Sequence, residues 1–292
     1  MKEILIISGK GGTGKTSITG AIAALSKNAV FADCDVDAAD LHLILTPEIK
    51  EKYEFISGNT ASINQTNCIS CGKCAENCRF DAIKINNNKY KIDSVMCEGC
   101  GVCTWMCPQK AIDFRPALCG HYYLSSTRFG QMVHAKLSIA AENSGKLVSQ
   151  VRAKAQDAAK ANNSDYIIID GPPGIGCPVI ASMTGVDYII IVTEPTVSGL
   201  HDMKRVLDLA KHFSICSYVC INKYSINQKV TAEIEDMLSD KKIPLIGKIP
   251  YDIDITEAQI NEKTIIEYSD NEAARAIKTM WNKFLNIINL KE

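Results

Sequence analysis

The sequence predicts an α/β protein with a doubly wound, mostly parallel sheet, into which a smaller α+β module is inserted. Three observations predict this architecture: short apolar runs alternate with helical stretches, a glycine-rich loop follows the first run, and eight of the thirteen cysteines lie between Cys68 and Cys107. Strands that alternate with helices form right-handed crossover units, which build parallel sheets. We therefore expect a host domain made of residues 1–61 and 117–292, interrupted by a module at residues 62–116.

The elements of the host follow from its hydrophobic pattern. Its apolar runs are continuous rather than alternating, which is typical of strands buried on both faces of a parallel sheet. Strands are predicted at Glu3–Ile7, Ala29–Ala32, Tyr166–Ile169, Tyr188–Val192, Tyr218–Ile221 and Leu245–Ile249. Helices are predicted at Lys15–Lys27, Lys146–Ala161, Gly199–Phe213, Gln228–Ser239 and Asn271–Ile288. We expect the apolar face of the last helix to pack on the sheet rather than on a membrane.

Composition excludes several classes of protein. The 292 residues carry a net charge of −1 and are 46% hydrophobic, so no basic field attracts nucleic acid or anionic lipid. No apolar run is long enough to span a bilayer, and the N-terminus lacks the features of a signal peptide. We therefore expect a cytoplasmic protein without nucleic-acid or membrane contacts. In that compartment dense cysteine indicates metal or redox chemistry rather than disulfides.

The glycine-rich loop is a candidate phosphate-binding site. Gly9–Thr16 reads G-K-G-G-T-G-K-T, which fits the G-x-x-x-x-G-K-[ST] pattern between a strand and a helix. The glycines let backbone N–H groups point at phosphate oxygens, and the helix N-terminus adds positive charge. Lys15 is predicted to bridge the β- and γ-phosphates, and Thr16 to join the Mg²⁺ shell. The predicted nucleotide-binding residues of this loop are Gly11, Gly12, Thr13, Gly14, Lys15, Thr16 and Ser17.

A second lysine, Lys10, stands early in the loop. The K-G-G-x-G-K-T pattern of Lys10–Thr16 resembles the deviant Walker motif of the MinD/ParA superfamily of P-loop ATPases. That superfamily also contains the nitrogenase iron protein and members labelled cobyrinic acid a,c-diamide synthase-like. The resemblance implies ATP, ADP and Mg²⁺ as ligands, and a homodimer (or a heterodimer with a paralogue) that closes across the nucleotides. It also implies that Lys10 reaches the partner's phosphates like an arginine finger supplied in trans.

The resemblance extends to the ends of the later strands. Asp35 lies where the family carries its first switch, which implies that it orients the attacking water or contacts the water shell of the metal. Asp170 closes a strand resembling the Walker B strand, and an aspartate there is well placed to hold a Mg²⁺-bound water. Asn222, Pro250 and Asp252 follow strands where the family holds adenine. For Asp37 and Asp40 a functional role and an ordinary loop role are both possible predictions, because clustered aspartates after a strand are also common in ordinary loops.

The cysteine-rich module contains an internal repeat of Cys-x2-Cys-x2-Cys-x3-Cys, which resembles a bacterial-type ferredoxin with two [4Fe–4S] clusters. In that family the fourth thiolate of each cluster comes from the other half of the repeat. The resemblance therefore implies one cluster on Cys68, Cys71, Cys74 and Cys107, and another on Cys97, Cys100, Cys103 and Cys78. The proline that follows Cys107 has no counterpart after Cys78, which is followed by Arg79. Structural zinc is the alternative, but it favours four ligands in paired Cys-x2-Cys arms.

The remaining cysteines receive separate predictions. Cys34, Cys216 and Cys220 lie in or beside apolar strands and are expected to pack as small hydrophobes. Cys177 follows Asp170 at an offset similar to that of a subunit-bridging cluster ligand in the nitrogenase iron protein. A third, bridging cluster at Cys177 is therefore a hypothesis, with Cys119 as a remote second ligand and quiet packing as the alternative.

The leading functional prediction is an ATPase in which nucleotide-dependent dimer closure gates electron transfer, or assembly of an iron–sulfur cluster or metallocofactor, on a partner protein. Its catalytic residues are predicted to be Lys10, Lys15, Asp35 and Asp170. The alternative is a MinD/ParA-type positioning or regulatory ATPase that uses its clusters as a redox sensor. An amide ligase of the cobyrinic-acid type ranks last, because the chain has no glutaminase domain.

Overall fold

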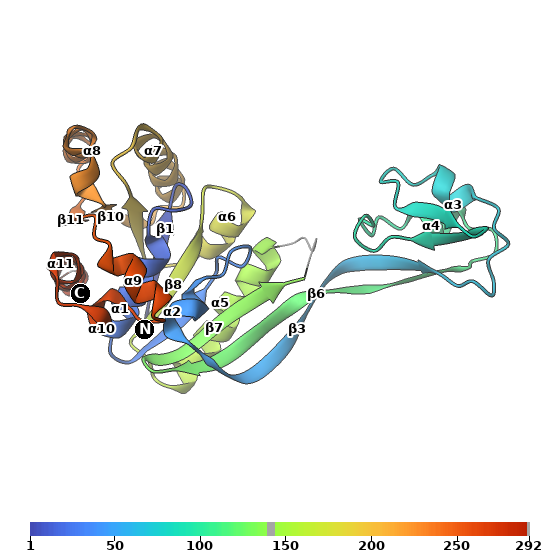
Figure 1. Cartoon of the computed structure of the whole chain (residues 1–292), viewed down its shortest axis with the longest axis horizontal. Helices are drawn as coiled ribbons and strands as arrows, with labels where there is room; N and C mark the ends of the chain where they lie inside the picture. The colour runs from blue at the N-terminus through green and yellow to red at the C-terminus, as the bar shows by residue number, and fades with distance from the viewer. Residues whose placement is uncertain (139–143, 291–292) are drawn as a thin grey trace. The chain divides into compact units, whose positions relative to one another are not determined.

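The computed structural model describes residues 1–138 and 144–290, which fold into two compact units (Figure 1). The larger unit is built from Met1–Lys52, Tyr122–Lys136 and the chain from Ser144 onward. The smaller unit consists mainly of Tyr53–His121. The predicted module, residues 62–116, lies within the smaller unit.

The larger unit is organised around a parallel sheet whose central strands come from the predicted apolar runs. In the described part of the chain the sheet has the order β11-β10-β9-β1-β8-β2-β7-β6-β3. Parallel pairing joins β1 to β8 and β9, with Ile4 opposite Ile168 and Tyr188. The strands that match predicted runs are β1 (Lys2–Ser8), β2 (Ala29–Asp33), β8 (Tyr166–Pro173), β9 (Tyr188–Thr193), β10 (Cys216–Asn222) and β11 (Leu245–Ile249). The predicted doubly wound α/β fold is confirmed.

The sheet continues beyond β2 through strands that the hydrophobic pattern did not reveal. These are β7 (Gly130–Leu137), β6 (Ile112–Thr127) and β3 (Glu48–Ile63). Most side chains of β3 before Phe55 are exposed, so this strand lacks the continuous apolar run of a central strand. Between β6 and β7 lie Arg128 and Phe129, a connection so short that it makes the two strands a hairpin.

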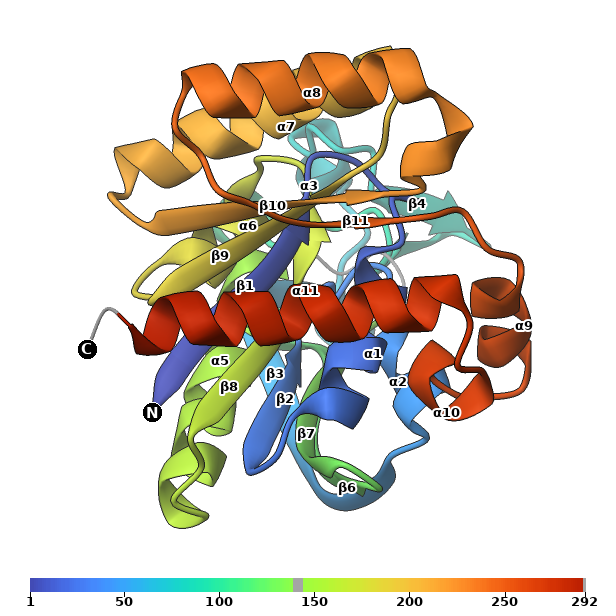
Figure 2. The same ribbon diagram turned by 90° about the vertical axis from the view of Figure 1, so that its left-hand side faces the viewer.

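Helices cover both faces of the sheet, as the crossover rule requires. On one face α1 (Lys15–Leu25) packs against α11 (Glu272–Asn289), which runs across the strands on the side facing the viewer in Figure 2. The other long helices are α5 (Ser144–Ala161), α7 (Val197–His212) and α8 (Gln228–Asp240). Shorter helices are α2 (Leu41–Leu45), α6 (Cys177–Met183), α9 (Asp254–Ile260) and α10 (Ile265–Tyr268). The predicted helices are present with ends shifted by a few residues.

The apolar face of α11 is part of the core, as predicted. Ile277, Met280, Trp281 and Phe284 on this face are at most 2% exposed, and the helix packs on β11 and α1. Asn271 begins the helix by accepting a hydrogen bond from the backbone N–H of Ala274. Within residues 1–138 and 144–290, none of the helices combines the length and the apolar character needed to cross a bilayer.

The smaller unit repeats one local arrangement in its two halves. Its elements include α3 (Lys73–Glu76), β4 (Ile83–Asn86), β5 (Lys89–Ile92) and α4 (Val102–Met106), and β4 pairs with β5 in antiparallel fashion. Each short helix is preceded by a glycine in the left-handed region, Gly72 at φ 80° and Gly101 at φ 78°. A Cβ at Gly72 would lie 2.9 Å from the Tyr90 hydroxyl, so a larger residue does not fit. The sequence repeat is therefore also a structural repeat.

Candidate functional site

The phosphate loop connects β1 to α1 at the carboxyl edge of the sheet. Gly14 takes the N-cap position of α1 with φ 85°, and Gly12 is also left-handed at φ 78°. A Cβ on Gly14 would collide with the side-chain amide of Asn222, so this position accepts only glycine. Because no side chain caps α1, its first backbone N–H groups are available to an anionic ligand.

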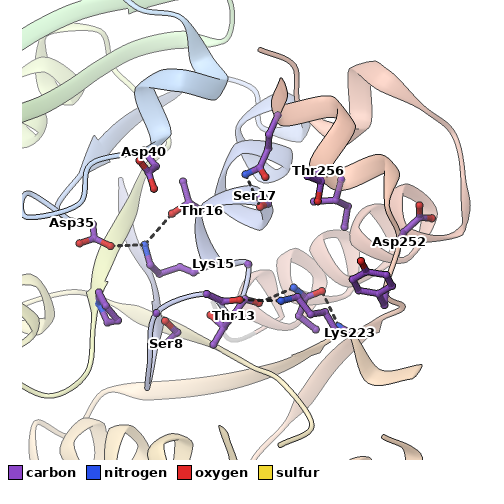
Figure 3. Close-up of a pocket in the computed structure, with 18 of the residues that line it drawn as sticks. Ser8, Thr13, Lys15, Thr16, Ser17, Asp35, Asp40, Lys223, Asp252 and Thr256 are labelled. Carbon is purple, nitrogen blue, oxygen red and sulfur yellow. Dashed lines mark hydrogen bonds and ion pairs between the residues drawn. The ribbon is translucent and has the colours of Figure 1, made fainter. Parts of the chain in front are cut away.

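A cavity of about 550 Å³ lies over this loop, a size suited to a nucleotide (Figure 3). The structure brings all the residues predicted to contact nucleotide to its wall: Gly11, Gly12, Thr13, Gly14, Lys15, Thr16, Ser17, Asn222, Pro250 and Asp252. Asp35 and Asp40 also line it, whereas Asp37 does not. The sequence analysis missed Lys223, Tyr251, Thr256 and Gln259. Lys223 adjoins Asn222 and could have been included, but α9 carries no motif that predicts its contribution.

Lys15 lies at the centre of a buried charge cluster. Its Nζ is 2.9 Å from Oδ1 of Asp170 and 3.4 Å from Oδ2 of Asp35. Oδ2 of Asp170 accepts a hydrogen bond from the hydroxyl of Thr16 at 2.8 Å, and its Oδ1 accepts one from the hydroxyl of Thr19 at 2.9 Å. Burial alone would lower the pKa of Lys15, but the charges of Asp170 and Asp35 outweigh burial and raise it. The ammonium group is therefore held charged at the loop.

The carboxylates around Lys15 exceed the positive charge available to them. Burial raises the pKa of Asp33 well above its usual value and also raises that of Asp35, and the charge of Asp170 adds to both shifts. Asp33 accepts hydrogen bonds from the backbone N–H groups of Asp35 and Leu41, so it fixes the loop after β2. Because negative charge exceeds positive charge in this cluster, a further cation would be bound favourably. The Thr16 hydroxyl and the carboxylate oxygens form a donor set that suits Mg²⁺.

Lys10 points to a neighbouring segment of the same chain. Its Nζ lies 2.6 Å from Oε1 of Glu194 and donates to the hydroxyls of Ser198 at 3.0 Å and Thr196 at 3.3 Å. Glu194 also lies 3.5 Å from the ammonium group of Lys223. The sequence analysis did not identify Glu194 or Ser198, because neither belongs to a motif. Any role of Lys10 across a dimer interface requires that it leave these partners.

Eight cysteines of the smaller unit line two cavities. One is lined by Cys68, Cys71, Cys74 and Cys107, and the other by Cys78, Cys97, Cys100 and Cys103. This is the crosswise grouping that the ferredoxin resemblance implies. Within the described ranges, no three or more His, Cys, Asp or Glu side chains form a group that could hold one metal ion.

Charge interactions between thiols act within each cavity, and Cys103 is also affected by Cys74 of the other cavity. Burial and the neighbouring Cys97 and Cys100 raise the pKa of the Cys103 thiol to about 11. Burial likewise raises the pKa of Cys74, and Cys107 contributes to that shift. The backbone N–H of Ala111 donates to Sγ of Cys107 at 3.2 Å, the type of hydrogen bond that tunes iron–sulfur centres. The raised pKa values of Cys74 and Cys103 mean that both thiols favour their protonated form in the absence of a ligand.

The other cysteines differ in their surroundings. Cys34 and Cys220 are buried as predicted, and burial raises the pKa of Cys220 to about 12. The packing prediction is wrong for Cys216, which is exposed because it is the first residue of β10 and lies before the buried part of the strand. Cys177 is exposed at the first position of α6. Cys119 is buried, and its thiol donates to the backbone carbonyl of Ser57 at 3.0 Å.

Comparison with known proteins agrees with this geometry. A family model described as the CobQ/CobB/MinD/ParA nucleotide binding domain matches residues 4–265. An uncharacterized protein of Methanocaldococcus jannaschii, MJ0578, is 33% identical over 289 residues, covering 98% of this chain and 97% of that protein. The septum site-determining protein MinD of Helicobacter pylori is 24% identical over 297 residues, covering 97% of this chain and 90% of that protein.

Solved structures show the same fold. The septum site-determining protein MinD of Pyrococcus horikoshii, solved with Mg-ADP, superposes with a TM-score of 0.60. The superposition covers 100% of this chain and 98% of the MinD chain, at 19% sequence identity. This similarity concerns the arrangement of the sheet and its helices, and not the chemistry of individual residues.

Proposed function

The chain belongs to the CobQ/CobB/MinD/ParA nucleotide-binding family as a P-loop ATPase of the MinD/ParA type, and we propose that its ATP cycle is a regulatory switch that the cysteine module makes sensitive to redox state. The observation that carries the nucleotide part is the cavity over the phosphate loop, where Lys15, Thr16, Asp35 and Asp170 converge. A redox-sensitive regulatory ATPase is the alternative function predicted from the sequence, and the family relationships favour it over electron delivery.

Under this proposal each side chain of the cavity has a role in hydrolysis. Backbone N–H groups of the loop and the ammonium of Lys15 bind the phosphates, while Asn222 and Asp252 lie on the wall where a base would rest. Thr16 and Asp170 would hold Mg²⁺, which supplies positive charge to the phosphate oxygens as they become more negative. Asp35 lies beside Lys15 with its carboxylate at the cavity, where it can orient the attacking water.

Dimerisation across the nucleotide would recruit Lys10. Its present contacts with Glu194, Thr196 and Ser198 are partly exposed, so they cost little to break. Once released, the ammonium can reach phosphates presented by a second copy or by a paralogue. Lys10 then acts as a finger that stabilises negative charge in the transition state.

The smaller unit is proposed to hold two [4Fe–4S] clusters, one in each cysteine-lined cavity. The donor set fits, because each cavity is lined by four thiols and Cys107 already accepts a backbone hydrogen bond. Such clusters exchange single electrons with their surroundings. Since β3 follows the loop of Asp33 and Asp35 in the chain, the redox state of the module can influence the ATPase through that connection.

The proposal is tested by measuring ATP hydrolysis under anaerobic conditions with the module oxidised and then reduced by dithionite. The proposal expects the rate to differ between the two states in the wild-type protein. A Cys71→Ser/Cys100→Ser variant, which alters one thiol in each cavity, should lose this difference while it keeps ATP binding. Equal rates in the oxidised and reduced wild-type protein would reject redox regulation but leave the ATPase assignment intact.

A second candidate function is delivery of electrons or of clusters to a partner protein. The observation that favours it is the exposure of Cys71 and Cys100, one thiol in each cavity, which would bring both clusters near the surface. Incubation with an apo-form iron–sulfur acceptor, with and without ATP, discriminates the two. Transfer of iron and sulfide to the acceptor supports cluster delivery, and reduction of an acceptor while iron stays bound supports electron transfer.

A further inference from the structure

Arg128, in the turn between β6 and β7, joins segments that are distant in sequence. Its Nε and Nη2 donate to the two carboxylate oxygens of Glu267 at 2.7 and 2.8 Å. Its Nη1 donates to the hydroxyl of Thr46 at 2.9 Å, and Nη2 also donates to the carbonyls of Ile44 at 2.8 Å and Glu262 at 3.2 Å. The guanidinium fork therefore fixes three stretches of backbone in one arrangement.

One group of these contacts reaches the phosphate side of the nucleotide cavity. Ile44 and Thr46 lie at the end of α2, a single short helix after Asp35 and Asp40 on the cavity wall. The start of α2 is held by the hydrogen bond from the Leu41 N–H to the buried carboxylate of Asp33. Arg128 therefore contacts the end of the short helix that directly follows the loop after β2.

The second group reaches the opposite wall of the same cavity. Glu262 lies in the connection from α9 to α10, and Glu267 lies in α10. Thr256 and Gln259 of α9 line the cavity. Gln259 also donates to the hydroxyl of Ser17 at 2.9 Å, which ties α9 to the helix that follows the phosphate loop. Arg128 therefore also contacts the segment that follows α9.

The carboxylate of Glu267 is fixed from two directions. It closes a capping box with Thr264, accepting from the backbone N–H and hydroxyl of that residue at 2.9 Å each. Burial alone would raise the pKa of Glu267, but the hydrogen bonds from Arg128 and Thr264 lower it. Glu267 therefore stays ionised, and its carboxylate remains a hydrogen-bond acceptor for the guanidinium of Arg128.

The position of Arg128 in the chain gives these contacts a consequence. β3 begins at Glu48, just after Thr46, and β6 ends at Thr127, immediately before Arg128. These are the strands through which the chain enters and leaves the smaller unit. The Arg128 and Glu267 side chains are 31% and 28% exposed, and an ion pair between partly exposed side chains contributes little to stability. Stability alone is a poor explanation for such an extensive set of contacts.

We propose that Arg128 is a positioning residue that couples occupancy of the nucleotide cavity to the two strands leading to the cysteine module. The inference deepens the proposed function and rests on it, since it names the link between the ATPase and the module. When a nucleotide draws both cavity walls together, the segments held by Arg128 move as one, and they carry the ends of β3 and β6 with them.

The test is amide hydrogen exchange of the anaerobically purified full chain, with and without a non-hydrolysable ATP analogue and Mg²⁺. In the wild-type protein, peptides from Glu48–Ile63 and Ile112–Thr127 should exchange more slowly when the analogue is bound. Arg128→Ala should bind the analogue as tightly but lose this difference. Arg275→Ala removes an exposed arginine of the larger unit that is paired with Asp270, and this variant should keep the difference.

The outcomes separate this inference from the proposed function. An Arg128→Ala protein that retains the full nucleotide-dependent difference overturns the role of Arg128 and leaves redox regulation standing. A wild-type protein without any difference in these strands also overturns the coupling through Arg128, whereas redox regulation is decided separately by the rates of ATP hydrolysis in the oxidised and reduced protein. If Arg128→Ala does not fold, the test uses Thr46→Ala, which removes one hydroxyl that accepts a hydrogen bond from Arg128. A reduced nucleotide-dependent difference in exchange supports the coupling, and an undiminished difference overturns it.

Discussion

Replacing Lys15 with methionine should destabilise the larger unit as well as prevent nucleotide binding. Lys15 is 5% exposed and Asp170 is 1% exposed, so the substitution leaves a buried carboxylate without its cation. Breaking a buried pair in this way costs about 3–5 kcal/mol. Thr16 and Thr19 still donate to Asp170, which places the expected loss near the lower limit, about 3 kcal/mol. Because typical domains unfold at about 5–15 kcal/mol, the variant should remain folded.

The assay is urea unfolding of the nucleotide-free protein in EDTA, followed through the fluorescence of Trp281. This tryptophan is buried in α11 of the larger unit, and Trp105→Phe removes the exposed tryptophan of the smaller unit. The double variant Lys15→Met/Asp170→Asn should recover about 1–3 kcal/mol, since the stranded charge is gone. A loss below about 1 kcal/mol in the single variant, or an equal loss in the double variant, refutes the reasoning.

The pH dependence of this effect follows from the direction of the pKa shift. The folded-state pKa of Lys15 is raised above 10.5, so its contribution to stability is fully present below that value and is lost only as pH rises through the folded pKa. The difference between wild type and Lys15→Met should therefore be constant from about pH 6 to 9.

Other substitutions test the remaining parts of the site. Lys10→Ala should lower steady-state ATP hydrolysis by about 10³-fold with little change in ATP binding by titration, and unchanged hydrolysis would contradict a role in trans. Cys107→Ser should lower the iron content measured after anaerobic purification, whereas Cys216→Ser should not; equal iron in both would argue against the cluster assignment. Asp35 has a raised pKa, so its contribution to stability is present below pH 3.8 and is lost as pH rises through the folded pKa. Asp35→Asn should therefore flatten the decline in melting temperature over that range, and an unchanged profile would show that Asp35 is not its source.

The strands next to the phosphate loop, and the loop itself, were predictable because burial and phosphate binding each leave a pattern in the local sequence. A strand buried on both faces must be continuously apolar, and a loop that wraps phosphate must have glycine where φ is positive, as at Gly12 and Gly14. The long strands β3 and β6 leave no such pattern, since most residues of β3 are exposed and most of β6 are exposed or half-buried. Their existence depends on pairing between segments far apart in the chain.

Local chemistry is what the sequence by itself determined: a phosphate loop, aspartates at the ends of strands, and cysteines in two spaced runs. Each depends on residues close together in the chain, so spacing alone reveals it. Only the tertiary structure decided that Lys15 lies between Asp35 and Asp170, that Lys10 contacts Glu194, and that Arg128 connects both cavity walls. These contacts join residues up to 184 positions apart in the chain, and no local pattern records them because an isolated arginine or glutamate in a loop is ordinary. Packing of the sheet and its helices brings them together, and so decides what the local motifs can do.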